Sequence, residues 1–149
     1  MELLNWRELD FASVVVAGLV AGYVMAMGGL WAGTIPGLVP IDIADFGRRY
    51  MSSDRPSAWL LGMGSHLVNS ILLVWLWAAV VEPNLSWPRP LEAALFGEVL
   101  AVALAGALMA PLSGMGFLGW KTGNPRFAIT TVLLHGLWGL TVGLVYVPK

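Results

Sequence analysis

The chain contains no cysteine and very little charge. The absence of cysteine excludes a disulfide framework, a thiolate metal site and a cysteine nucleophile. Only 11% of its 149 residues are charged and 58% are hydrophobic, which excludes an ordinary soluble globular domain. The net charge of -1 provides no basic surface for nucleic acid. This composition is that of an integral membrane protein, whose first partner is membrane lipid.

The few charges fall between long apolar stretches. A helix needs about 20 apolar residues to cross the roughly 30 Å hydrocarbon layer. Lipid permits only helices and closed barrels, and runs as continuous as these lack the alternation of barrel strands. The sequence therefore predicts an all-α integral membrane four-helix bundle. It forms a single transmembrane domain over residues 1–149, with spans at about 12–34, 57–81, 91–110 and 127–147.

Basic residues predict the orientation of the bundle. The loops around 35–56 and 111–126 carry five of the eight Lys and Arg residues, namely Arg48, Arg49, Arg55, Lys121 and Arg126. Cytoplasmic loops of membrane proteins are enriched in Lys and Arg. We therefore expect these two loops in the cytoplasm and both termini outside.

The first of these loops contains a helical pattern. In PIDIADFGRRYMSSD, the residues Ile43, Phe46 and Tyr50 recur at helical spacing. Asp42 precedes them, and its side chain could accept from a free amide of the first turn. We predict a short interfacial helix at the inner membrane surface.

Several tryptophans lie near the predicted span ends. Tryptophan is enriched where a membrane meets water, so these residues are expected to anchor the spans there. They are Trp59, Trp75, Trp77, Trp87 and Trp120.

The two halves of the chain resemble each other. AGYVMA at 21–26 matches AGALMA at 105–110, and His66 and His135 follow in the same order. This pattern predicts two pseudo-repeated helical hairpins related by an axis along the membrane normal.

Small residues mark the faces on which the spans pack. They let helix backbones approach closely, which is how helices associate in lipid. The face in the first span could instead dock a neighbouring subunit. The glycines concerned are Gly18 and Gly22 in the first span, and Gly136, Gly139 and Gly143 in the fourth.

Two histidines are the main polar groups inside the spans. At 1.5 Å per residue, His66 lies roughly 15 Å and His135 about 14 Å from the inner helix ends, near the midplane. At the same rise per residue, Glu98 in the third span lies roughly 6–8 Å from the depth of the histidines. It shares a helix face with a stripe of alanines, which predicts that its carboxyl faces another helix. The sequence predicts that the two histidines belong to a buried polar network with Asn69, Ser70, Glu98 and Thr131.

Three interpretations of these groups stay open. They can be hydrogen-bond partners that fix packing, each worth about 0.6 kcal/mol in a membrane. His66 and His135 can bind a cofactor, either haem b with Gly62, Gly136 and Gly139 making room, or one metal ion shared with Glu98. Glu98 and the histidines can also form a proton or ion path. Packing without a cofactor or metal is the interpretation that we favour.

The strings LLGMGSHLVNSILLVWLWAAVV and LLHGLWGLTVGLVY, with IDIADFGRRY before them, resemble a family of small four-span prokaryotic membrane proteins of unknown function. The resemblance covers most of the chain and implies a prokaryotic inner membrane location. Small proteins of this kind also occur as accessory subunits of respiratory or photosynthetic complexes.

We therefore expect a non-catalytic accessory or assembly subunit of a larger, electron-transfer membrane complex, with other integral membrane subunits as partners. No nucleophile elbow, phosphate loop or His-Glu-x-x-His motif is present. The alternatives are a small electron carrier that binds haem b or a metal through His66 and His135, and a proton-coupled transporter or channel that uses Glu98.

Overall fold

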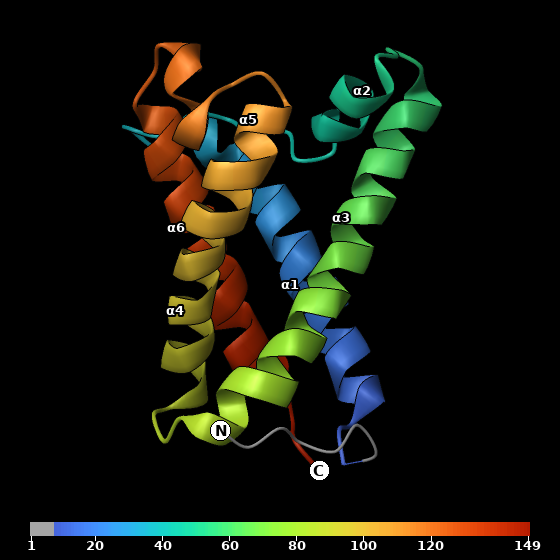
Figure 1. The fold of residues 1–149 in the computed structure, drawn as a ribbon, viewed down its shortest axis with the longest axis vertical. Helices are drawn as coiled ribbons and strands as arrows, with labels where there is room; N and C mark the ends of the chain where they lie inside the picture. Colours follow the sequence, from blue (N-terminus) through green and yellow to red (C-terminus); the bar gives the residue numbers. More distant parts are fainter. Residues whose placement is uncertain (1–7) are drawn as a thin grey trace.

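A computed structural model describes residues 8–149, and the described part of the chain is helical throughout, without strands (Figure 1). Short and distorted helices lie between or extend the longer ones. The elements in chain order are α1 (Phe11–Trp31), η1 (Ala32–Thr34), α2 (Asp45–Met51), α3 (Pro56–Leu76), η2 (Trp77–Val81), η3 (Glu82–Asn84), α4 (Arg89–Leu100), η4 (Ala101–Met109), α5 (Ala110–Leu112), η5 (Phe117–Thr122) and α6 (Arg126–Val145).

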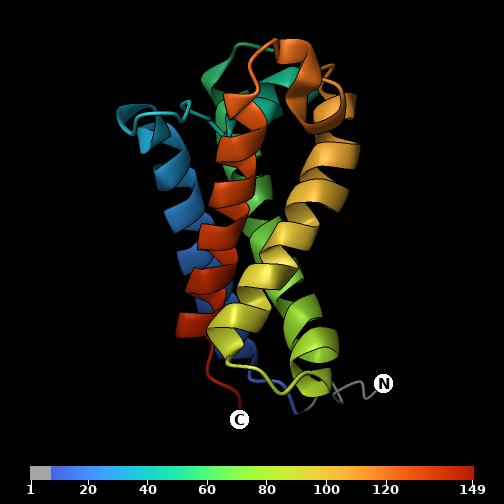
Figure 2. The same cartoon turned by 90° about the vertical axis from the view of Figure 1, so that its left-hand side faces the viewer.

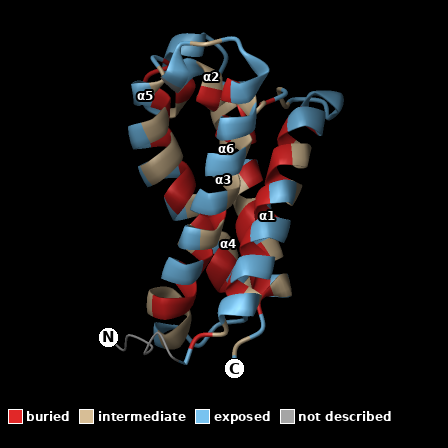
Figure 3. Cartoon of the chain, turned by 90° about the vertical axis from the view of Figure 1, so that its right-hand side faces the viewer, coloured by how far each residue is buried: buried red, intermediate tan, exposed pale blue. Residues whose placement is uncertain are grey.

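Within residues 8–149, four continuous helical stretches are long and apolar enough to cross a membrane, which confirms the all-α four-span architecture. They comprise Phe11–Thr34, Pro56–Asn84, Arg89–Leu112 and Arg126–Val145. Large apolar residues are exposed along all four. Figure 3 shows the buried positions along the faces of the helices that look toward the interior of the bundle. This arrangement suits a protein whose surroundings are hydrocarbon.

Local sequence explains where the spans begin and end. The Asp10 carboxylate accepts a hydrogen bond from the Ser13 amide at 3.0 Å and so caps α1. Pro56 occupies the first turn of α3, where the missing N–H costs nothing. The first described residues and the C-terminus lie at one end of the bundle, here called the terminal end (Figures 1 and 2). The segments 32–55 and 113–125 lie at the other, the loop end.

The helix expected in the first loop is present as α2, although Asp42 does not cap it. The N-cap position is Ala44, without a side-chain bond, and the Asp42 carboxylate accepts from the Ala44 amide and the Trp59 indole instead. Asp42 thus fixes the turn before α2 and ties it to α3. The close contact of Gly47 with the backbone of Gly62 holds α2 on the start of α3. The side chain of Tyr50 lies outside the described part.

Helix packing within the chain fills the glycine face of the first span. A Cβ on Gly18 would lie 2.6 Å from Ile71 Cα, and one on Gly22 would lie 3.1 Å from Ser70 Oγ. The hypothesis that this face is spare for a neighbouring subunit is therefore wrong, because α3 covers it.

The α4–α6 contact is an equally close one. Gly139 abuts the Ala93 carbonyl, and Gly143 abuts Pro90. Gly136 differs, because only the flexible end of the Glu98 side chain occupies its space.

Trp77 is a buried residue, so its expected role as an interfacial anchor is wrong. The helix that contains it continues to Asn84, which places Trp77 inside the span. Its side chain is fully buried and meets the Tyr146 ring edge to face at 5.4 Å. Trp87 and Trp120 remain exposed at opposite ends of the bundle.

One interface of the bundle is open toward the loop end. α1 packs on α3 and α6, and α4 packs on α6. If the two halves are repeats, the counterpart of the α1–α6 interface is the one between α3 and the third span. That counterpart closes chiefly at the terminal end, where η2 and η3 reach α4. Toward the loop end, α3 and η4 diverge (Figure 1).

Candidate ligand-binding cavity

A cavity of about 330 Å³ lies where α3 and η4 diverge. α1 and α6 contribute to its walls, and the 41–46 segment borders it toward the loop end. Its surface is mostly apolar, with side chains such as Leu73, Leu104 and Phe127. Both membrane histidines line it, so the structure brings together the two residues that the sequence singled out.

His135 stands on α6 with one ring nitrogen bound to its own helix. The Nδ1–H donates to the Thr131 carbonyl at 2.8 Å, because a carbonyl oxygen can only accept. In the neutral ring, Nε2 therefore carries the lone pair. No described residue bonds to Nε2.

His66 stands on α3 and bonds across to α1. Its Nε2 lies 3.0 Å from the carbonyl oxygen of Gly22, so Nε2–H is the donor and Nδ1 carries the lone pair. The two imidazoles are thus held in opposite tautomers by backbone acceptors. Each retains one unprotonated nitrogen.

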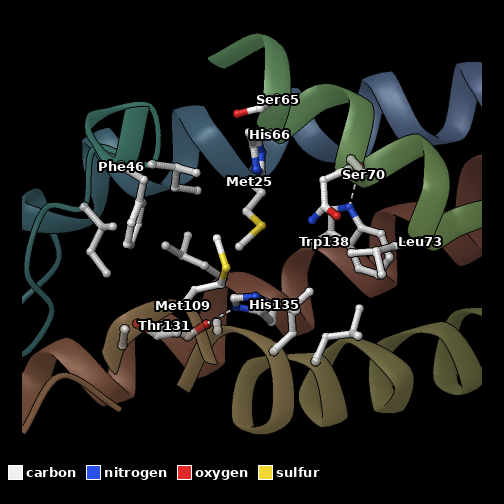
Figure 4. Close-up of a pocket in the computed structure, with 18 of the residues that line it drawn as sticks. Met25, Phe46, Ser65, His66, Ser70, Leu73, Met109, Thr131, His135 and Trp138 are labelled. Atoms are coloured by element: carbon white, nitrogen blue, oxygen red, sulfur yellow. Dashed lines mark hydrogen bonds between the residues drawn. The ribbon is translucent and has the colours of Figure 1, made fainter. Parts of the chain in front are cut away.

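Two methionines lie between the histidines. Figure 4 shows the thioethers of Met25 and Met109 in the space between the two imidazole rings. Sequence reasoning missed both as site residues, although a signal was available. Met25 and Met109 occupy the same position in the matching strings AGYVMA and AGALMA.

A hydrogen-bond chain beside the cavity joins three spans. The Trp138 indole N–H donates to Ser70 Oγ at 2.7 Å, and the Ser70 hydroxyl donates to the Gly18 carbonyl at 2.7 Å. All three residues are buried. Ser70 is therefore a polar packing residue, as the sequence predicted, whereas Trp138 was not foreseen.

Ser70→Ala is expected to destabilise the bundle by about 1–2 kcal/mol, because it leaves the buried Trp138 indole N–H without a partner and removes the interhelical bond to the Gly18 carbonyl. Unfolding in mixed micelles measures the loss. Ser65→Ala is the matched control, since that hydroxyl bonds only to the Gly62 carbonyl of its own helix. Equal stability of the two variants would contradict the prediction.

The remaining members of the predicted network do not form one. Thr131 lines the cavity and its hydroxyl donates within α6, to the Phe127 carbonyl at 2.9 Å. Asn69 also lines the cavity, and its amide has no hydrogen-bond partner among the described residues. Glu98 does not line the cavity and packs over Gly136 instead.

A distorted helix explains the position of Glu98. The third span changes from α-helix to π-helix at Ala101, so residues beyond that point rotate relative to those before it. Ala105 therefore faces the cavity while Glu98 does not, and the expected alanine stripe is broken. Glu98 and His135 nevertheless lie at similar depth, because Gly97, the residue before Glu98, contacts the His135 carbonyl.

The residues do not fit haem b. A planar macrocycle on His66 would have to bind Nδ1, beside the residue's own backbone, because Nε2 is bound to Gly22. Of the glycines expected to make room, Gly62 abuts the Ala44 carbonyl and Gly139 abuts the Ala93 carbonyl. Both spaces are filled.

A metal shared by the histidines and Glu98 has no arrangement to support it either. Over residues 8–149, no group of three or more His, Asp or Glu side chains could hold a metal ion. The predicted proton path requires continuous polar contacts between Glu98 and the histidines. This part of the chain does not contain them.

Neither a protein-family model, nor a curated protein, nor a solved structure matches the chain. The four spans are those of a small four-span membrane protein. The family resemblance stays a prediction.

Proposed function

We propose that the chain binds a lipid-soluble small molecule in the cavity between α3 and η4, with the polar head of the molecule at His66 and His135. The observation that carries this proposal is the cavity itself. It is a mostly apolar space at bilayer depth into which two imidazoles offer unpaired nitrogens.

The dimensions and chemistry support such a ligand. Binding sites for small molecules have volumes of roughly 300–1,000 Å³, mostly apolar walls and a few placed polar groups. The cavity has about 330 Å³ and this mixture of side chains. Two imidazole nitrogens and the Asn69 amide on the cavity lining lack a hydrogen-bond partner among the described residues, and they favour an occupant that pairs with them.

The divergence of the helices supports entry from the bilayer. α3 and η4 flank the cavity, and both present exposed apolar side chains to the surroundings, such as Val68 on α3 and Leu108 on η4. A molecule dissolved in the hydrocarbon layer can reach the histidines between these helices without crossing water.

This role is compatible with the accessory subunit of an electron-transfer complex that the sequence predicts. That assignment, the prokaryotic inner membrane and the external termini stay predictions. Four of the five basic residues lie in the segments of the loop end, and the fifth, Arg126, begins α6 directly after them, which supports a cytoplasmic position for that end.

Filling the cavity is expected to weaken binding. With a decyl-substituted hydroquinone as probe, Ala105→Phe should weaken saturable binding in lipid nanodiscs by at least about tenfold, equivalent to about 1.4 kcal/mol. Ala105 lines the cavity. Ala107, on the same π-helix, is exposed and lies outside it, so Ala107→Phe is the matched control.

Calorimetric titration, corrected for partition into protein-free nanodiscs, measures this difference. Two results would overturn the proposal. One is the absence of saturable binding to the native chain. The other is an equal effect of the two phenylalanines.

A further inference from the structure

The polar atoms around the cavity have nearly all used their hydrogens. The N–H of His66 goes to Gly22 and that of His135 goes to Thr131, both backbone carbonyls. The indole N–H of Trp138 goes to Ser70. None of these three side chains has a further hydrogen to give if the imidazoles are neutral.

The hydroxyl groups follow the same rule. Ser65 donates to the Gly62 carbonyl at 2.9 Å, Ser70 to the Gly18 carbonyl and Thr131 to the Phe127 carbonyl. Each hydroxyl has one hydrogen, so what it can still offer to a ligand is a lone pair. Among the described residues of the lining, the Asn69 amide is the single side-chain group that still has hydrogens to donate.

The imidazoles are neutral for a structural reason. No Asp or Glu side chain within residues 8–149 lines the cavity, so a charged imidazolium there would lack a counter-ion from this part of the chain. An unpaired charge at bilayer depth is costly. His66 Nδ1 and His135 Nε2 therefore act as hydrogen-bond acceptors.

We propose that the ligand is a hydroxyl-bearing molecule with an apolar body, and that its head donates hydrogen bonds to His66 and His135. A hydroquinone, with two hydroxyl groups, is the simplest head that pairs with both rings. This inference rests on the proposed function and names the chemistry of its ligand.

The same geometry discriminates against the corresponding quinone. A quinone carbonyl is an acceptor, and facing it with an imidazole lone pair leaves both atoms unpaired. Reversing a tautomer does not help, because the hydrogen would leave a nitrogen that lies against a backbone carbonyl. Sites built to pair with a hydroxyl reject analogues that lack it far more strongly than apolar pockets reject a methylene.

Three probes with one carbon skeleton test the inference. They are a decyl-substituted hydroquinone, its quinone and its dimethyl ether, titrated anaerobically against the full chain in nanodiscs and corrected for partition. We expect the hydroquinone to bind at least about tenfold more tightly than either of the others, a difference of about 1.4 kcal/mol.

Histidine variants assign this preference to the two rings. His135→Phe and His66→Phe should each reduce it. His135→Gln places an amide oxygen near the site of Nε2, and His66→Asn places one near the site of Nδ1, so both should retain part of it. Retention of the full preference in both phenylalanine variants would overturn the inference.

The outcomes separate the two proposals. Equal or tighter binding of the quinone would overturn the preference for a donor head and leave cavity binding standing. Saturable binding of none of the three probes would overturn the proposed function itself.

A measurement without ligand provides a second test. The chain has two histidines, so nitrogen NMR of histidine-labelled protein should show two neutral imidazoles of opposite tautomer, assigned with the single variants. A doubly protonated ring, or two rings of the same tautomer, would remove one of the acceptors and overturn the inference whatever the probes show.

Discussion

Gly139→Ala is expected to destabilise the bundle by about 3 kcal/mol, at the upper end of the usual cost of overpacking. The new methyl group would meet the Ala93 carbonyl and would lie 2.7 Å from Ala94 Cα. Both are backbone atoms, which cannot rotate away as a side chain can. α4 and α6 would have to separate, and their contact is the most extensive in the fold.

Gly136→Ala on the same helix is the control for this prediction. Its methyl group would meet the carboxyl end of Glu98, which a change of rotamer can move. We expect the new methyl group at position 136 to cost less than about 1 kcal/mol of stability. The higher helix propensity of alanine over glycine is worth about as much and offsets that cost. Unfolding in mixed micelles compares the two. Equal losses at both positions would show that backbone contact at Gly139 does not decide stability.

The contrast between these glycines shows where sequence reasoning ends. A stripe of small residues indicates that another backbone approaches, but it does not say which one. From the sequence alone, the glycines of the first span could pack against a neighbouring subunit. In the structure, α3 of the same chain covers them. Partner choice depends on the relative tilt of helices, which periodicity does not carry.

The spans themselves were predictable because lipid imposes a length and an apolar composition on any crossing helix. The helix of the second span begins one residue earlier and runs three residues further than expected, from Pro56 to Asn84. Trp77 lies on the face of that helix that packs against Tyr146, whereas Trp75, two residues earlier, is exposed. Tryptophan near an expected span end looks like an anchor, and the last turns of a longer helix remove it from the interface.

The sequence predicts two residues of the cavity but not the shape of the cavity. His66 and His135 were placed near one depth by counting residues, and the structure puts both on one cavity. The count assumed a uniform rise and turn, so it could not place Glu98 beyond the reach of that cavity. Nor could it give the tautomers, since these depend on carbonyl groups at Gly22 and Thr131 that only the packed helices bring into range.

Glu98→Leu is expected to favour insertion of the third span by about 3 kcal/mol. An ionisable residue at the centre of a spanning helix costs about 2.5–3.5 kcal/mol on insertion scales, whereas leucine is favourable by about 0.5. Glu98 is half-exposed at the depth of Gly136, with no hydrogen-bond or ion-pair partner among the described residues. Nothing within this part of the chain offsets its cost.

The fraction of the 89–112 segment that inserts, measured with and without the substitution, gives this free energy. Val99→Leu is the control, because the neighbouring Val99 is 61% exposed and already apolar, and it should change insertion little. Unchanged insertion of Glu98→Leu would mean that the carboxyl is paired in the membrane by a group outside residues 8–149. Because Glu98 does not line the cavity, the same variant should also bind the hydroquinone probe as the native chain does. A loss of probe binding would couple this carboxyl to the histidines through α4 and α6, and would return Glu98 to the functional site from which the geometry separates it.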